Sequence, residues 1–192
     1  MRVKICGITT VRDALIAEEE GADAIGIVVC SDSKRSVPVS RARAIFAALR
    51  PNTEKICVTN TQSQSDLELI LSLKPTAIQI PQNLKVPAGV GTKVYRVASG
   101  ETGIPEKCDA VVIDQSCGRG IVYDRSYAEK VVEKSAVPVI LAGGLTPDNV
   151  GDAIRDLRLY AVDVSSGVEK SKGIKDRKKM REFIEICRRP AV

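Results

Sequence analysis

The chain has 192 residues, long enough for one well-buried domain and short for two, so we expect a single domain over residues 1–192. Hydrophobic residues make up 44% and charged residues 28%, as in an ordinary globular protein, and the absence of histidine excludes any His-based triad, metal site or proton carrier. The net charge of +5 suits an anionic small-molecule substrate, whereas an aromatic content of 3% leaves few stacking platforms for nucleic acid.

Eight short runs rich in Val and Ile recur along the chain, and each is apolar on both faces. Such runs are typical of strands that are buried on both sides of a parallel sheet. The predicted strands are Val3–Cys6, Ala24–Val29, Lys55–Thr59, Ala77–Ile80, Lys93–Val97, Ala110–Asp114, Val139–Ala142 and Ala161–Ser165.

Amphipathic segments lie between most of these runs and predict helices. The expected N-terminal capping residues are Thr10, Ser40, Ser65, Asp124 and Thr146. The predicted helices are Val11–Glu20, Arg41–Leu49, Asp66–Leu73, Arg125–Lys134, Pro147–Leu157 and Asp176–Arg188.

The alternation of strand and helix is compatible with a doubly wound sheet or with a (β/α)8 TIM barrel, both of which are α/β folds. The first strand ends in Cys6-Gly7-Ile8-Thr9 rather than in a GxGxxG turn, and there are eight strands, so the barrel is favoured. The segments Pro81–Thr92 and Ala98–Asp109 are rich in Pro and Gly. We therefore expect a barrel that is trimmed around its fourth and fifth helices.

Nothing in the sequence indicates export or a membrane span. The N-terminus lacks the apolar core and cleavage site of a signal peptide, and no apolar run reaches the length of a transmembrane helix. We expect a cytoplasmic protein with no membrane or nucleic-acid partner. The six cysteines form no CxxC pair and the chain has no Cys/His cluster, so we expect no metal site. A monomer and a homodimer both remain open.

The candidate catalytic residues are polar residues that end apolar strands, because a barrel of this kind has its active site at the C-terminal ends of the strands. Asp114 is either a partly desolvated carboxyl that carries a proton near neutral pH or a structural acceptor of loop N–H groups. Cys6 is either a thiolate base or a packing residue. Arg2 and Lys4 are expected to alternate with the inward-facing positions.

The candidate binding residues lie in three loops. Gly143-Gly144 and Ser166-Gly167 follow the seventh and eighth strands and expose backbone N–H groups, which favours a phosphate site, although the glycines can also serve only tight turns. Arg35 follows the second strand. Its guanidinium is either a two-point partner for a substrate carboxylate or an exposed loop charge.

Three segments are more specific than any single residue: Val3–Thr9 (VKICGIT), Leu141–Val150 (LAGGLTPDNV) and Ala161–Glu169 (AVDVSSGVE). Through them the chain resembles phosphoribosylanthranilate isomerase, a family of tryptophan biosynthesis. The resemblance implies an isomerase that converts N-(5'-phosphoribosyl)anthranilate to 1-(o-carboxyphenylamino)-1-deoxyribulose 5-phosphate. That reaction is an acid/base Amadori rearrangement that needs no cofactor.

The resemblance also implies a role for each candidate residue. Asp114 would be the general acid that protonates the ribose ring oxygen, and Cys6 the general base that removes the C2′ proton. Arg35 would hold the anthranilate carboxylate, and Asp163 would lie near the anthranilate amino group. The phosphate would be bound by Gly143, Gly144, Ser165, Ser166 and Gly167.

The sequence departs from the family pattern in three places, one of which is the reduced region Pro81–Asp109. Gln79-Ile80-Pro81-Gln82 stands where the family usually has Gln-Leu-His-Gly, and the loop after the acid, Ser116–Gly120, is altered and shorter. Two other functions stay open: a non-catalytic barrel that binds a phosphate ligand, and a related isomerase of an aminoimidazole carboxamide sugar phosphate. The latter uses an Asp where Cys6 stands, so the sequence disfavours it.

Overall fold

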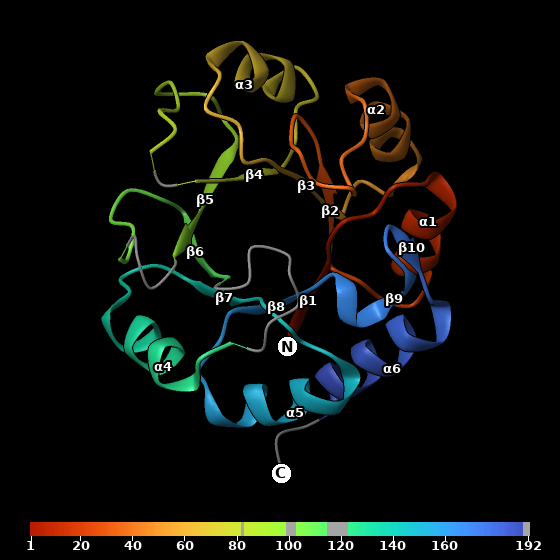
Figure 1. The fold of residues 1–192 in the computed structure, drawn as a ribbon, viewed down its shortest axis with the longest axis vertical. Helices are drawn as coiled ribbons and strands as arrows, with labels where there is room; N and C mark the ends of the chain where they lie inside the picture. Colours follow the sequence, from red (N-terminus) through yellow and green to blue (C-terminus); the bar gives the residue numbers. More distant parts are fainter. Residues whose placement is uncertain (82, 99–102, 115–122, 190–192) are drawn as a thin grey trace.

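The computed structural model describes residues 1–81, 83–98, 103–114 and 123–189. Its centre is a closed barrel of eight parallel strands, in which each strand pairs with the next along the chain and the last pairs with the first (Figure 1). The strands are β1 (Arg2–Ile5), β2 (Ala24–Val28), β3 (Glu54–Val58), β4 (Ala77–Ile80), β5 (Lys93–Ala98), β6 (Ala110–Ile113), β7 (Val139–Leu141) and β8 (Ala161–Val164). The predicted barrel is therefore confirmed.

Side chains along each strand alternate between the outside and the inside of the barrel. Val3 and Ile5 of β1, like Val162 and Val164 of β8, belong to the large outer core beneath the helices. The other set faces inward and forms a second, smaller core, whose members are Ala24, Ile56, Ala77, Tyr95, Ala110, Val112, Ile140, Ala142 and Ala161. Small alanines at many inward positions leave room inside the barrel for a few large polar side chains.

Helices surround the barrel on the outside (Figure 1). They are α1 (Val11–Glu19), α2 (Val39–Ala48), α3 (Gln64–Leu71), α4 (Arg125–Lys134), α5 (Pro147–Asp156) and α6 (Arg177–Arg188). Residues 83–92 and 103–109 contain no helix, so the described parts of the β4–β5 and β5–β6 connections are trimmed as predicted. Within the described ranges, no helix is long and apolar enough to cross a bilayer.

Hydrogen bonds confirm two predicted helix starts and correct two others. The side chains of Thr10 and Asp124 each accept a bond from the backbone N–H three residues later, at 3.1 Å. The prediction for α3 is wrong because Ser63, not Ser65, is the cap. Several Ser and Thr residues precede this helix, and capping chemistry alone does not distinguish between them.

The start of α2 was also predicted wrongly. The helix begins at Val39, directly after Pro38, and Ser40 lies inside its first turn. Pro38 has a φ of −59° and makes no side-chain capping bond. The fixed φ of proline sets the entry to this helix without a hydroxyl cap.

A short hairpin connects β8 to the last helix and contacts the loop after β1. It consists of a 3-10 turn η1 (Ser166–Val168) and strands β9 (Glu169–Ser171) and β10 (Ile174–Lys175). The Thr9 hydroxyl donates to the Gly173 carbonyl at 2.6 Å, and the Lys175 N–H donates to the Asp13 carboxylate at 3.3 Å. Figure 1 shows the hairpin beside α1. The hairpin therefore places charged residues from the last part of the chain next to the segment that follows β1.

The loops that follow β7 and β8 contact each other so closely that Gly167 has no room for a side chain. A Cβ on Gly167 would lie 1.9 Å from the Leu145 carbonyl oxygen. Gly167→Ala should therefore lower the free energy of unfolding by about 3 kcal/mol or more. Gly151→Ala in α5 is the matched control, because its Cβ would lie 3.4 Å from the nearest atom, in Ile186, and helix propensity favours alanine. Urea denaturation of both variants measures the difference, and equal stabilities would contradict this packing.

Candidate active site

The predicted acid and base lie at the C-terminal end of the barrel. Cys6 directly follows β1, and Asp114 directly follows β6. Cys6 alternates with the outward-facing Ile5, and Asp114 lies two residues after the inward-facing Val112. Asp163, in β8, alternates with outward-facing neighbours in the same way. The three side chains therefore come from β1, β6 and β8 and project to the inside of one barrel.

Lys4 was placed wrongly by the sequence analysis. It was expected to alternate with the inward-facing positions, but it lies two residues before Cys6 and therefore shares its face. Its Nζ donates to Asp163 Oδ2 at 2.6 Å and to Gln79 Oε1 at 2.8 Å. Both ends of the ion pair are buried, with side-chain exposures of 3% for Lys4 and 5% for Asp163. Arg2 is also on this face and pairs with Glu54 at 3.1 Å, lower in the barrel.

Gly26 in β2 makes space for the base and the lysine. A Cβ at Gly26 would lie 2.9 Å from the Cys6 Sγ and 2.9 Å from the Lys4 Cε. Both atoms thus pack over the same backbone position, so the sulfur and the end of the lysine are neighbours. A glycine inside an otherwise apolar strand indicates a close approach of this kind, and this signal was not used in the sequence analysis.

The protonation of Cys6 depends on opposing effects. Burial is the largest of them and raises the pKa of the Cys6 thiol above its ordinary value, and the charge of Asp163 raises it further. The charges of Lys4 and Lys175 act in the other direction. Burial alone would lower the pKa of Lys4, but Asp163 and Cys6 outweigh it and the pKa of Lys4 is raised. The lysine is therefore a fixed cation.

Asp163 offers one unused acceptor. Burial raises the pKa of this carboxyl, Lys4 lowers it, and the nearby charge of Asp114 raises it. Its Oδ2 is engaged by Lys4, while its buried Oδ1 has no hydrogen-bond partner within the part of the chain that the structure describes. A buried polar atom left in this way is unusual in a native protein. It is suited to accept a hydrogen bond from a ligand.

Arg35 is buried and is not the exposed loop charge that the sequence left open. Its Nε and Nη2 donate to the two carboxylate oxygens of Glu169, each at 2.7 Å. The carboxylate that Arg35 binds in this structure thus belongs to the chain itself. A guanidinium has five N–H groups, and this two-point contact uses one edge of the fork. Among the described residues, Glu169 is the side chain that Arg35 binds, and the N–H groups outside this contact suit a second carboxylate.

Lys175 joins the same cluster, although nothing in the sequence pattern marked it as a site residue. Its side chain is fully buried. The Nζ donates to the Ser165 carbonyl at 3.0 Å and to Glu169 Oε1 at 3.2 Å. Burial is the largest effect on Lys175 and lowers its pKa, which Glu169 and Cys6 partly oppose.

The loops proposed to bind phosphate are brought together by the fold. Gly143 and Gly144 have φ values of +90° and +63°, which favour glycine. Gly167 packs against Leu145, so the loop after β8 touches the loop after β7. Ser165 lies at the same place, because a Cβ on Gly7 would come within 2.8 Å of its hydroxyl. The loops after β7 and β8 therefore lie in contact with each other, and Ser165 lies beside the loop that follows β1.

Pro81, which stands where the family usually has histidine, takes part in the folded structure through its backbone carbonyl. The Pro81 carbonyl accepts a bond from Arg96 Nη1 at 2.9 Å, and the Leu84 carbonyl accepts one from Arg96 Nη2 at 3.1 Å. Gln79, two residues before Pro81, holds Lys4. The shortened loop Ser116–Gly120 lies outside the described residues.

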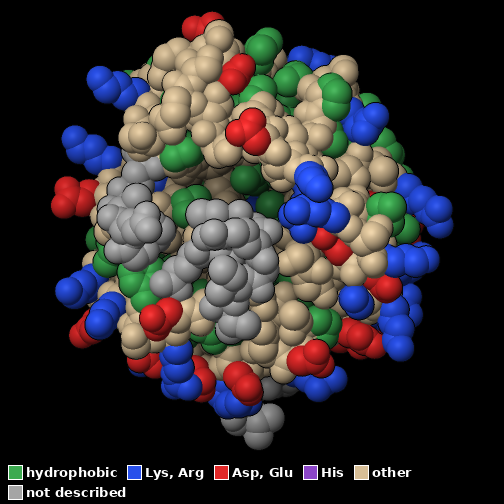
Figure 2. Space-filling model, viewed as in Figure 1, with side chains coloured by type: hydrophobic (Ala, Val, Ile, Leu, Met, Phe, Trp, Pro, Cys, Tyr) green, Lys and Arg blue, Asp and Glu red, His purple; other side chains and the backbone are tan. Residues whose placement is uncertain are grey.

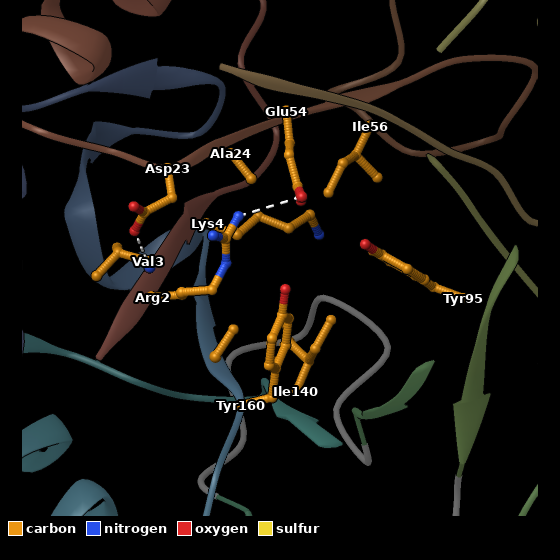
Figure 3. Close-up of a pocket in the computed structure, with 11 residues that line it drawn as sticks. Arg2, Val3, Lys4, Asp23, Ala24, Glu54, Ile56, Tyr95, Ile140 and Tyr160 are labelled. Atoms are coloured by element: carbon orange, nitrogen blue, oxygen red, sulfur yellow. Dashed lines mark hydrogen bonds and ion pairs between the residues drawn. The ribbon is translucent and has the colours of Figure 1, made fainter. Parts of the chain in front are cut away.

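A small pocket lies toward the opposite end of the barrel, and Lys4, which pairs with Asp163, is one of the residues that line it (Figure 3). Arg2 lies above the ring of Tyr160, 5.5 Å from its centroid, and pairs with Glu54. Among the described residues, no group of His, Cys, Asp and Glu side chains is arranged to hold a metal ion. Figure 2 shows the other face, at the C-terminal ends of the strands, where Lys and Arg side chains are spread among Asp and Glu around the rim and a depression lies near the centre.

Glu169 holds two buried cations, so its loss should destabilise the fold. Glu169→Gln should lower the free energy of unfolding by about 3 kcal/mol at neutral pH, because Arg35 and Lys175 lose their shared counter-ion. Burial raises the pKa of Glu169, but Arg35 and Lys175 outweigh it and the net pKa is below 4.5. The contribution is therefore fully present above pH 4.5 and is lost as the pH falls through the lowered pKa.

Denaturation at a series of pH values measures this effect. The control is Glu129→Gln, which removes the exposed ion pair with Arg125 and should change stability little. A Glu169→Gln variant as stable as the control would show that the buried cluster is not under strong electrostatic constraint.

Comparison with known proteins agrees with this geometry. A family model described as N-(5'phosphoribosyl)anthranilate (PRA) isomerase matches residues 3–186. The N-(5'-phosphoribosyl)anthranilate isomerase of Methanoregula boonei is 52% identical over 189 residues, which cover 98% of this chain and 97% of that relative.

Solved structures give the same result. The crystal structure of phosphoribosyl anthranilate isomerase from Thermus thermophilus has a TM-score of 0.84 at 32% identity, and the match covers 97% of this chain and 98% of that one. A phosphoribosyl anthranilate isomerase in complex with reduced 1-(o-carboxyphenylamino)-1-deoxyribulose 5-phosphate has a TM-score of 0.77 at 29% identity, covering 96% and 97% of the two chains. The chain therefore belongs to the N-(5'-phosphoribosyl)anthranilate isomerase family.

Proposed function

We propose that this chain converts N-(5'-phosphoribosyl)anthranilate to 1-(o-carboxyphenylamino)-1-deoxyribulose 5-phosphate, with Cys6 as general base and Asp114 as general acid. The observation that carries the assignment of roles is the inward projection of Cys6, Asp114 and Asp163 at one end of the barrel. The reaction is an internal redox rearrangement in which the aldose carbon is reduced and its neighbour oxidised. It needs only proton transfers, so no external oxidant or cofactor takes part.

The two proton transfers, one to the ring oxygen and one from C2′, require groups on different sides of the sugar. Asp114 protonates the ribose ring oxygen, and the ring opens to a protonated Schiff base. Cys6 then removes the C2′ proton, and the electron pair of that C–H bond forms the enolamine. Protonation at C1′ and tautomerisation give the ketone. Because β1 and β6 are not adjacent in the barrel, the base and the acid approach the substrate from different directions.

Substrate recognition uses the groups that surround these two. Asp163 Oδ1, which has no hydrogen-bond partner among the described residues, accepts the N–H of the anthranilate amine, and the Arg35 N–H groups outside the Glu169 contact bind the anthranilate carboxylate. The phosphate is bound by backbone N–H groups of the loops that contain Gly143, Gly144, Ser165, Ser166 and Gly167. Lys175 adds positive charge beneath the second loop. We further propose that residues 1–192 act as one domain in the cytoplasm.

Removal of either catalytic group should abolish most of the turnover. Cys6→Ser and Asp114→Asn should each lower kcat by about 10²- to 10⁴-fold, because a serine hydroxyl does not ionise to a base near neutral pH as a thiol can, and an amide is not an acid. The decay of substrate fluorescence measures the rate. Cys108→Ser is the matched control, since Cys108 lies before β6 at the other end of the barrel.

The outcome is read together with far-UV circular dichroism, which checks that each variant is folded. Unchanged turnover in folded Cys6→Ser would remove the base role from Cys6. Unchanged turnover in folded Asp114→Asn would move the acid role to another group.

A change of Arg35 should affect substrate affinity more than turnover. Arg35→Lys keeps one positive charge but loses the forked donor geometry, so KM should rise about tenfold while kcat falls less. Lys34→Ala, an exposed neighbour in the same loop, should leave both constants unchanged. Steady-state kinetics separate the two parameters, and an unchanged KM would exclude Arg35 from carboxylate binding.

A further inference from the structure

A buried lysine adjoins the proposed base, and neither the sequence analysis nor the proposed chemistry gives it a role. Lys4 lies two residues before Cys6 on the same inward face of β1. Its ammonium donates to Asp163 at 2.6 Å and to Gln79 at 2.8 Å, which orients it from β8 and from β4. Burying a lysine inside a barrel costs free energy unless it is paired and hydrogen-bonded. An apolar residue would fill the same space without that cost.

The position of the lysine relative to the sulfur is set by Gly26. The Lys4 Cε and the Cys6 Sγ lie at equal distances, 2.9 Å, from the point where a Cβ of Gly26 would be. The lysine chain therefore passes next to the sulfur before its ammonium reaches Asp163. An ammonium has three N–H groups, and the bonds to Asp163 and Gln79 use two of them.

The charged groups that face Cys6 come from four elements. Lys4 belongs to the same strand, Asp163 to β8, Lys175 to β10 and Arg35 to the loop after β2. Arg35 and Lys175 share Glu169 as their counter-ion. Lys4 is paired with Asp163, whose carboxylate also faces the sulfur, so the Lys4–Asp163 pair sets the local balance of charge at Cys6.

We propose that Lys4 is a positioning residue that holds a fixed positive charge beside Cys6 and thereby makes the thiolate form of this base accessible. The proposal rests on the proposed role of Cys6. Asp163 and Gln79 hold the ammonium in place, and the lysine does not itself take the substrate proton. When the substrate N–H bonds to Asp163 Oδ1, the carboxylate opposes the thiolate less, so substrate recognition and activation of the base are linked through this one side chain.

The test is a titration of Cys6 in the protein without substrate, followed by the ultraviolet absorbance of the thiolate. Each variant is compared with its own Cys6→Ser partner, which subtracts the other cysteines and the tyrosines. Lys4→Met keeps the length of the side chain and removes the charge. It should move the Cys6 titration to higher pH by about one unit or more. Lys4→Arg keeps the charge and should return the titration most of the way to the wild-type position.

A third variant keeps the test informative if Lys4→Met does not fold. Lys4→Met leaves Asp163 buried without its partner, whereas Lys4→Met/Asp163→Asn removes both charges together and is less disruptive. The double variant should also titrate at higher pH than the wild type, by a smaller shift, because one opposing charge is lost as well. Thermal unfolding identifies any variant that is not folded.

The outcomes are decisive in either direction. If Cys6 titrates at the wild-type pH in Lys4→Met or in the double variant, the proposal is overturned. A Lys4→Arg titration no closer to wild type than that of Lys4→Met would also overturn it, because a purely structural role does not depend on charge. The measurement needs no turnover, so loss of the proposed isomerase function would appear separately, as inactivity of the wild-type protein.

Discussion

The buried ion pair between Lys4 and Asp163 is the interaction on which the interior of the barrel depends. At 2.6 Å, and with both side chains almost fully enclosed, it ties β1 to β8 where the sheet closes. It compensates for the burial of two charges, and within the described ranges it leaves one carboxylate oxygen without a hydrogen-bond partner near the proposed base and acid. The same contact that closes the barrel thus supplies an acceptor and a cation to the site.

A second charged cluster connects the end of the chain to the same place. The hairpin of β9 and β10 contains Glu169 and Lys175. Glu169 accepts hydrogen bonds from Lys175 and from Arg35, which lies in the loop after β2. Gly7 permits this approach, because a Cβ there would lie 2.6 Å from the Arg35 Cδ. The active-site loops are therefore rigidified by ion pairs that involve the chain's own carboxylates. A guanidinium held along one edge is oriented before a substrate arrives, which reduces the ordering needed on binding.

Much of the fold could be predicted from the sequence, because each strand is a short run that is apolar on both faces and eight such runs specify a barrel. The predicted strand ends were within one residue of those observed. The starts of α2 and α3 were wrong because Ser and Thr residues are frequent in the preceding loops. The face of Lys4 was within reach of sequence reasoning, since strict alternation places it on the side of Cys6. The pairing of Arg35 with Glu169 was not, because it joins residues 134 positions apart through the folded loops.

We propose that this barrel rearranges its substrate by proton transfers to and from its own side chains, without a cofactor. The most direct measurement is the decay of fluorescence when the purified wild-type protein is mixed, in the presence of a chelator, with N-(5'-phosphoribosyl)anthranilate generated in situ. We expect the substrate fluorescence to decay rapidly, with formation of an isomer of identical mass. A folded protein that binds a product analogue but causes no decay would contradict it, and would mean that the barrel binds the ligand without catalysing the reaction.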